Sequence, residues 1–142
     1  VFHCTQACLP DMITQKWGRI INIASTAGLK AYAYVSAYCT AKHGVIGLTR
    51  SLALETANAG ITVNAICPGY TDTAITDSAI ENISLKTGRT KTEAREELLK
   101  HNPQKRFIQP EEIANTVLWL CQQEAASVTG QAISISGGEV MS

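Results

Sequence analysis

Residues 61–69 have the sequence ITVNAICPG, in which an apolar and largely β-branched run stops at a Pro-Gly pair. Such a run is typical of a strand that is buried on both faces in a parallel sheet. Residues 19–24 (RIINIA) and 131–136 (QAISIS) have a similar length and composition. Helical patterns separate the three runs along the chain, so the sequence predicts an α/β fold built on a parallel sheet.

Five stretches have the character of helices, at residues 1–16, 36–57, 77–85, 91–101 and 110–123. The second ends at Asn-Ala-Gly, a common C-terminal signal, and the last begins with Pro-Glu-Glu, which suits the first turn of a helix. Pro10 lies inside the first stretch, so we expect a kink or a later start there.

Three strands make a small sheet with two open apolar edges, and such edges favour aggregation. The sequence also begins at Val1 and Phe2, without a methionine. We therefore expect residues 1–142 to be the C-terminal half of one doubly wound domain, whose N-terminal half supplies further strands.

The composition excludes some classes of partner. The chain has 142 residues, with 12 Lys plus Arg and 12 Asp plus Glu, so its formal net charge is zero. A nucleic-acid partner or an anionic membrane surface requires an excess of basic residues, so neither is expected. No apolar run is long enough to span a bilayer.

The cysteines suggest a cellular compartment. Five of them occur at irregular spacings, and no CxxC pair is present. This usage predicts buried free thiols in a reducing compartment, the cytoplasm, with neither a disulfide framework nor a metal site.

Tyr38 and Lys42 have the clearest chemical signal. Four residues apart on a helix, they share one face, with Cβ atoms about 5–6 Å apart. An ammonium group beside a phenol favours the phenolate, and such a tyrosine can exchange a proton with a substrate oxygen. An isolated Tyr-Lys pair at this spacing is most often an ordinary surface pair, so its surroundings decide the interpretation.

The surroundings place further polar groups at strand ends. Ser25 follows the strand at 19–24 directly, and a Pro-Gly pair closes the strand at 61–67. Because the carboxyl ends of parallel strands lie at one edge of the sheet, ligands bind there. The residues expected to meet at this edge are Ser25, Tyr38, Lys42, Pro68, Gly69, Thr71 and Thr73.

Several stretches resemble the short-chain dehydrogenase/reductase family, namely GRIINIAS (18–25), YCTAKHG (38–44), ITVNAICPG (61–69), VTGQ (128–131) and SGG (136–138). Together they extend over nearly the whole chain. The resemblance implies a Rossmann-like doubly wound parallel sheet, a small-molecule alcohol or carbonyl substrate, and NAD or NADP as cofactor.

The resemblance also implies a role for individual residues. Tyr38 is the acid/base, Lys42 assists it and binds the nicotinamide ribose, and Ser25 holds the substrate oxygen. The implied cofactor-binding residues are Tyr38, Lys42, Pro68, Gly69, Thr71 and Thr73, and the implied substrate-binding residues are Ser25 and Tyr70.

The sequence departs from the family pattern in its cofactor site. No GxGxxG loop occurs, and the residue that reads the adenosine ribose and the catalytic Asn are also absent. We therefore expect residues 1–142 alone to bind cofactor poorly, and the choice between NAD and NADP stays open. Residues 74–108 match no family motif, and in the family this is the variable substrate-binding segment.

The resemblance further suggests a substrate class. The motifs are similar to those of 3-oxoacyl reductases and 3-hydroxybutyrate dehydrogenases. The latter hold a free carboxylate with a His and a Lys at positions that here are Ala27 and Val35. A 3-hydroxyacyl or 3-oxoacyl thioester is therefore expected in preference to a small free hydroxy acid.

Two further expectations concern assembly and an alternative function. Family members pair the helix equivalent to 36–57 with its symmetry mate, which implies a homodimer or homotetramer. Small residues at Ala41, Gly44 and Gly47 suit such a contact or a contact with the sheet. The alternative to an enzyme is a catalytically silent binding or scaffold protein of the same fold, or an inactive fragment.

Other residues have a structural interpretation. We expect Asn64 to tie backbone segments together, His43 to pack structurally, and Trp119 to belong to the core. The charged run 93–100 is expected to be a solvated helix face or a lid over the substrate, with residues 87–92 as the hinge of such a lid.

Overall fold

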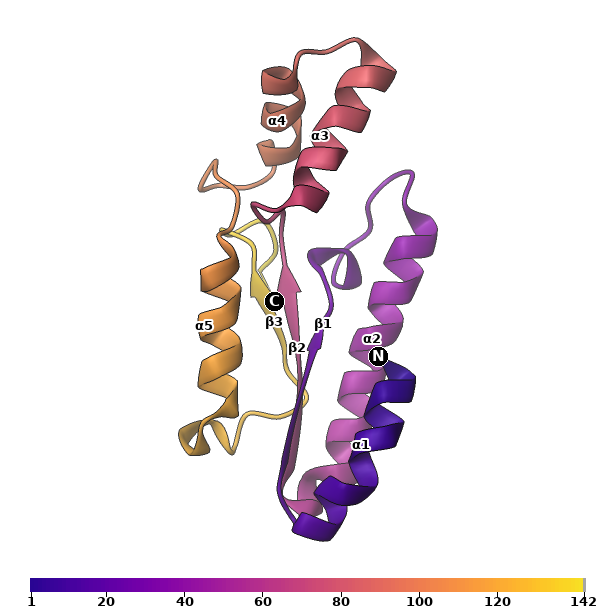
Figure 1. Cartoon of the computed structure of the whole chain (residues 1–142), viewed down its shortest axis with the longest axis vertical. Coiled ribbons are helices and arrows are strands. Elements are labelled where there is room, and N and C mark those ends of the chain that lie inside the picture. The colour runs from indigo at the N-terminus through magenta and orange to yellow at the C-terminus, as the bar shows by residue number, and fades with distance from the viewer. Residues whose placement is uncertain (142) are drawn as a thin grey trace.

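A single three-stranded parallel sheet forms the centre of the computed structural model, which describes residues 1–141. The strands are β1 (Gly18–Ile23), β2 (Ile61–Pro68) and β3 (Ala132–Ile135), in that spatial order. Every residue from 61 to 67 is buried, because β2 has a strand on each side and helices over both faces (Figure 1). The parallel α/β architecture predicted from the sequence is confirmed.

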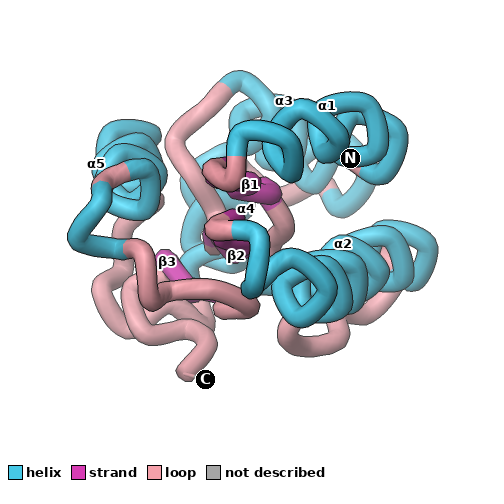
Figure 2. The backbone as a smooth tube through the Cα atoms, turned by 90° about the horizontal axis from the view of Figure 1, so that it is seen from below, coloured by secondary structure: helices cyan, strands magenta, loops and turns pink. Residues whose placement is uncertain are grey.

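Helices cover the two faces of the sheet. On one face lie α1 (Phe2–Gln15) and α2 (Ser36–Thr56), and on the other lies α5 (Pro110–Cys121), as Figures 1 and 2 show. The larger core cluster under α1 and α2 consists of Ile20, Leu52, Ala53, Ile61 and Val63, with Leu9, Met12 and Ala59 packed against it. Helices on both faces agree with the doubly wound arrangement.

The first helix differs from expectation. It begins at Phe2 and continues through Pro10, so the later start is wrong. Leu9 and Met12 pack against the core cluster and hold the helix on the sheet across the proline, whose missing N–H costs only one backbone bond.

Two helices lie beyond the carboxyl ends of the strands. They are α3 (Ala74–Thr87) and α4 (Lys91–Leu99), which pack on each other as a hairpin (Figure 1). Their own small core consists of Ile80, Ala94, Leu99 and Phe107. The hairpin is pinned at its base, where Asp72 N donates to Ile108 O and Ile108 N donates to Tyr70 O, both at 2.9 Å.

The connection at the tip of this hairpin, where the sequence suggested a hinge, is short and capped at both helix ends. Gly88 ends α3 in the left-handed region at φ 72°, a conformation that suits glycine. Thr90 caps α4 by accepting from Glu93 N, and the Glu93 carboxylate accepts from Thr90 N. Both helix ends are therefore satisfied by a tight, capped turn.

The exposure of several side chains also differs from expectation. Cys39 and Cys67 are buried, whereas Cys4, Cys8 and Cys121 are exposed. The prediction of buried thiols is wrong for these three, because they lie on the outward faces of α1 and α5. None of the helices in the described part of the chain combines the length and apolar character needed to cross a bilayer.

Candidate functional site

Lys42 links α2 to the end of β1. Its Nζ donates to Ile23 O at 3.0 Å and lies 5.6 Å from the centroid of the Tyr38 ring. The Tyr38 side chain remains 49% exposed, so its hydroxyl is open to a ligand. The predicted pair is thus brought together on one helix face, with the ammonium group held at the carboxyl end of a strand.

Ser25 lies two residues beyond Ile23, at the same strand end. Its backbone is extended, and its Oγ accepts a hydrogen bond from Ala27 N at 3.1 Å as the cap of a short 3-10 turn, Thr26–Gly28. Burial raises the pKa of the neighbouring Cys67 thiol, and a hydrogen bond from the Ser25 backbone opposes this rise. Because Ser25 Oγ only accepts here, its own proton is available to another acceptor.

The exit of β2 passes close to the end of β3. Gly69 N donates to Ile135 O at 2.9 Å, and a Cβ added at Gly69 would lie 3.2 Å from Ser136 Cα. Glycine at this position therefore allows the two strand ends to approach. Beyond it, the Thr71 hydroxyl donates to Gly69 O at 3.1 Å and the Thr73 hydroxyl to Thr71 O at 3.4 Å, so both shape the loop.

Tyr70 lies at the same edge. Burial raises the pKa of its phenol, and the nearby Glu139 carboxylate and Tyr38 raise it further. Tyr70 therefore lies close enough to Tyr38 and Glu139 to be influenced by them, and its contact with substrate stays a prediction.

A buried carboxylate at this edge was missed by the sequence analysis. Glu139 Oε1 accepts from the Tyr32 hydroxyl at 2.6 Å and lies 2.9 Å from Lys30 Nζ. Burial raises the pKa of the Tyr32 phenol well above its usual value, and the hydrogen bond to Glu139 adds to the rise. The available signal was the Gly137-Gly138 pair at a strand end, which brings the next residue to the same edge.

Asn64 has the structural role predicted for it. Its Nδ2 donates to Val128 O at 2.7 Å, and its Oδ1 accepts from Gln131 N at 3.1 Å. His43 differs from expectation: its side chain is exposed, and its Nδ1 lies 2.9 Å from Cys39 O on its own helix.

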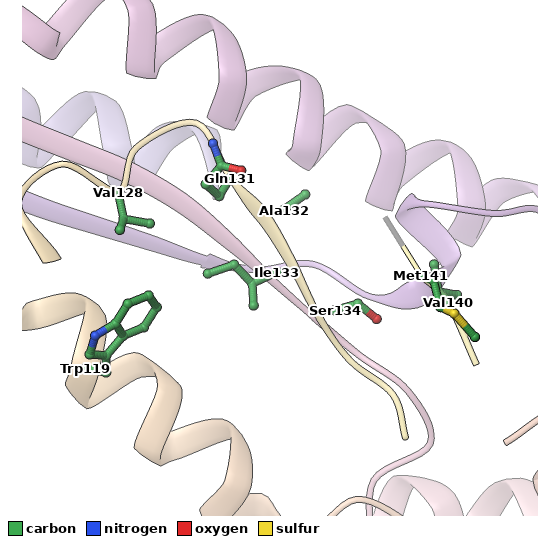
Figure 3. Close-up of a pocket in the computed structure, with 8 residues that line it drawn as sticks. All are labelled: Trp119, Val128, Gln131, Ala132, Ile133, Ser134, Val140 and Met141. Carbon is green, nitrogen blue, oxygen red and sulfur yellow. The ribbon is translucent and has the colours of Figure 1, made fainter. Parts of the chain in front are cut away.

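A separate groove of about 530 Å³ runs along β3 (Figure 3). Its lining residues are Trp119, Val128, Gln131, Ala132, Ile133, Ser134, Val140 and Met141. Trp119 is 44% exposed here, so its assignment to the core is wrong; the adjacent Leu120 is the fully buried residue of α5. The groove contains none of the predicted site residues and no side chain suited to acid-base chemistry.

Within residues 1–141, no group of three or more His, Cys, Asp or Glu side chains is placed so that it could hold a metal ion.

Comparisons with known proteins cover almost the whole chain. The sequence profile of the family described as "Enoyl-(Acyl carrier protein) reductase" matches residues 1–139. D-beta-hydroxybutyrate dehydrogenase of Rhizobium meliloti is 44% identical over 138 residues, which are 96% of this chain and 54% of that protein. The 3-oxoacyl-(acyl-carrier-protein) reductase of Staphylococcus aureus is 40% identical over 141 residues, 99% of this chain and 53% of that protein.

Solved structures share the fold. A variant of actinorhodin polyketide ketoreductase crystallised with NADPH superposes with a TM-score of 0.85 at 41% identity, over 90% of this chain and 49% of that one. Sorbitol-6-phosphate 2-dehydrogenase of Erwinia amylovora has a TM-score of 0.86 at 35% identity, over 92% and 52%. The chain spans about half the length of the relatives it matches. The Rossmann-like fold is thereby confirmed, and the chain belongs to the short-chain dehydrogenase/reductase family.

Proposed function

We propose that the chain carries the catalytic part of an NAD(P)-dependent oxidoreductase that interconverts a secondary alcohol and a ketone. The observation that carries the proposal is the position of the Lys42 ammonium group, bonded to the end of β1 and 5.6 Å from the Tyr38 ring. Folding alone does not require a lysine beside an exposed tyrosine at this edge. Relatives named as a dehydrogenase and a reductase support the same class.

The domain assignment follows from this proposal. Residues 1–142 form the C-terminal part of a single Rossmann-like domain, and residues 74–108 form its variable substrate-binding segment. The position of the α3–α4 hairpin beyond the carboxyl ends of the strands supports this assignment, since ligands of parallel sheets bind at those ends.

Tyr38 performs the proton transfer in the proposed reaction. Its hydroxyl gives a proton to the ketone oxygen during reduction and takes one from the alcohol during oxidation. The positive charge of Lys42 stabilises the phenolate left behind. Ser25 donates a hydrogen bond to the same substrate oxygen, using the proton that its contact with Ala27 N leaves available.

A nicotinamide cofactor, NAD or NADP, supplies or accepts the hydride. The residues that would hold it are Tyr38, Lys42, Pro68, Gly69, Thr71 and Thr73. The donor set fits the nicotinamide end, because Lys42 keeps two ammonium hydrogens beyond the one given to Ile23 O. Thr73 makes no side-chain cap on α3, which leaves the first N–H groups of that helix open to a phosphate.

We further propose a 3-hydroxyacyl or 3-oxoacyl thioester as substrate. Ala27 is buried at 3% exposure and carries no polar group, and Val35 is equally unable to pair with a free carboxylate. The relative from Staphylococcus aureus is named as a reductase of 3-oxoacyl-(acyl-carrier-protein), and this name supports the choice. The Rhizobium meliloti relative, named for a free hydroxy acid, supports the competing choice.

Tyr38→Phe tests the enzyme against a silent scaffold or inactive fragment. In the protein at its full natural length, we expect the variant to lose about 100-fold or more in kcat while it still binds NAD(P)H, because only the transferable proton is removed. Tyr34→Phe is the matched control, since the Tyr34 side chain is fully exposed. No turnover by either protein would favour the scaffold or inactive fragment, and equal turnover by Tyr38→Phe and wild type would contradict the role of Tyr38.

The substrate class is tested by comparing kcat/KM for a 3-oxoacyl thioester and for free 3-hydroxybutyrate with its ketone. We expect the thioester to be preferred by at least about tenfold, because Ala27 and Val35 occupy the positions of the His and Lys that would hold a carboxylate. Comparable values would overturn the thioester proposal and leave the enzyme class intact.

We also propose a homodimer or homotetramer through α2, in a reducing compartment such as the cytoplasm. A Cβ added at Gly44 or Gly47 would meet nothing within 4 Å, so the small-residue face of α2 does not contact the sheet. This open face supports contact with a second copy. Light scattering of wild type and of Gly47→Glu should show the variant as the smaller species.

A further inference from the structure

Glu139 belongs to the turn that follows β3, yet its carboxylate is almost completely enclosed, with a side-chain exposure of 3%. Two polar groups from the loop between β1 and α2 converge on one oxygen of this carboxylate. The Tyr32 hydroxyl donates to it at 2.6 Å, and Lys30 Nζ lies 2.9 Å away. A buried carboxylate that is both ion-paired and hydrogen-bonded forms strong, orienting contacts.

The loop that Glu139 contacts connects two proposed catalytic residues. Ser25 stands at its beginning, and Tyr38 follows its end in the first turns of α2. Across residues 31–35, the described chain shows no long-range backbone hydrogen bond from an N–H group. Tyr34 is fully exposed and has a positive φ of 66°, so the backbone itself does little to hold this loop.

The contact reaches the residue next to Ser25. The Tyr32 hydroxyl that donates to Glu139 also lies 2.9 Å from Thr26 Oγ1. Thr26 is buried and follows Ser25 directly. A chain of polar contacts thus runs from the Glu139 carboxylate through Tyr32 to the turn that orients the Ser25 hydroxyl.

The turn that carries Glu139 is itself held in place. Val140 N donates to Ser136 Oγ at 3.1 Å, and Glu139 N donates to Ser136 O at 3.2 Å. Gly137 has a positive φ of 62°, and an added Cβ there would clash with the Asn102 side chain beyond α4. The turn therefore lies between the loop after β1 and the segment that ends the α3–α4 hairpin.

We propose that Glu139 is a positioning residue: through Tyr32 and Lys30 it fixes the loop between β1 and α2, and so sets the spacing of Ser25 from Tyr38. This inference rests on the proposed oxidoreductase function. It makes the C-terminal turn part of the catalytic architecture, although no Glu139 atom takes part in proton transfer.

The test uses Tyr32→Phe, Glu139→Gln and Glu139→Leu in the protein at its full natural length. Tyr32→Phe keeps the ring and removes only the hydroxyl, and we expect kcat to fall about 10- to 100-fold with little change in substrate KM. Glu139→Gln keeps an oxygen for the Tyr32 hydroxyl and should retain more kcat than Glu139→Leu. Because the two residues share one contact, Tyr32→Phe combined with Glu139→Leu should lose less kcat than the product of the two single losses.

NAD(P)H binding, measured by fluorescence, counts the folded sites, so that kcat is expressed per competent site. Glu124→Gln is the control: Glu124 is an exposed residue of the 3-10 turn Gln123–Ala125 that follows α5, and its replacement should leave kcat unchanged. Unchanged kcat per site in Tyr32→Phe, or equal losses in Glu139→Gln and Glu139→Leu, would overturn the positioning role.

The proposed function is judged separately by wild type and Tyr38→Phe. If that variant is inactive and Tyr32→Phe is fully active, the positioning role fails and the oxidoreductase stands. If wild type at full natural length shows no turnover, the oxidoreductase proposal itself fails; full turnover by Tyr38→Phe would instead remove the proposed role of Tyr38.

Discussion

Lys42 performs two tasks with one ammonium group. One hydrogen bond, to Ile23 O, anchors α2 to the end of β1, and the remaining charge lies beside the Tyr38 ring. A lysine stem is long enough to make both contacts from the helix, and its compact head presents three donors. The same side chain thus connects α2 to the strand end and lies beside the residue proposed as the acid/base.

Lys42→Ala is therefore expected to lower kcat by about 100-fold, because it removes the charge that favours the phenolate. Lys42→Arg keeps a positive charge in a larger, planar group and should retain intermediate activity. Steady-state kinetics at full natural length measures both. Lys86→Ala, at an exposed position in the last turn of α3, is the control; a Lys42→Ala variant as active as this control would contradict the role.

At the scale of elements, an ion pair holds the start of α5. Arg106 Nη1 and Nη2 lie 2.6 Å and 2.8 Å from the two Glu112 carboxylate oxygens. Gln109 N donates to the same carboxylate at 2.7 Å, next to Pro110 in the first turn. The segment between α4 and α5, which carries Arg106, is thereby joined to α5, the helix on the face of the sheet opposite to α1 and α2.

This arrangement predicts a pH dependence of stability. The hydrogen bonds from Arg106, followed by that from Gln109 N, lower the pKa of Glu112 from 4.5 to about 2. Because the folded pKa lies below the unfolded value, the stabilisation is complete above pH 4.5 and disappears as the pH falls toward 2. The Tm of wild type should exceed that of Glu112→Gln near neutral pH, and this difference in Tm should vanish near pH 2.

Thermal melts between pH 2 and pH 7 check this prediction. Glu111→Gln is the matched control, since the described part of the chain shows no ion pair at Glu111. A Tm difference for Glu112→Gln that is independent of pH would contradict the assignment of the stabilisation to the charged pair.

At the scale of the whole molecule, the site gathers at one edge of a small sheet. Ser25 follows β1, Gly69 follows β2 and Glu139 follows β3, while the α3–α4 hairpin projects beyond all three (Figure 1). None of these three residues lines the groove along β3 (Figure 3). In the proposed function this edge meets the nicotinamide end of the cofactor and the substrate. The 142-residue sequence contains no GxGxxG loop for the remainder of a dinucleotide.

We expect the 142-residue chain by itself to show no detectable dehydrogenase turnover and weak NAD(P)H binding. Both edges of its sheet are unpaired among the described strands, so the isolated chain should also associate as its concentration rises. Light scattering and NAD(P)H fluorescence, with the full-length protein as control, measure both properties. Turnover by the isolated chain would contradict the expectation.

Much of the architecture was predictable because its signals are local. A continuous apolar run predicts strand β2, and the spacing of Tyr38 and Lys42 is enough to place them on one helix face. Helix boundaries differ from the prediction where tertiary contacts fix the chain. Helix α3 begins at Ala74, three residues before the expected start, shortly after Thr71 pairs with Ile108. Pro10 stayed within α1 because packing of its neighbours outweighed the lost backbone bond.

The order of strands and helices, the motifs at strand ends and the Tyr-Lys pair follow from the sequence, since each depends on residues close together in the chain. The environment of Glu139 does not: its partner Tyr32 is 107 residues away, and no periodicity connects them. Likewise, the apolar stripe of α5 does not reveal that Leu120 is buried while Trp119 is 44% exposed, because this depends on how the helix is oriented against the sheet. Contacts between distant segments arise only when the sheet brings the ends of β1, β2 and β3 to one edge, because burial and hydrogen bonding there are properties of the assembled fold.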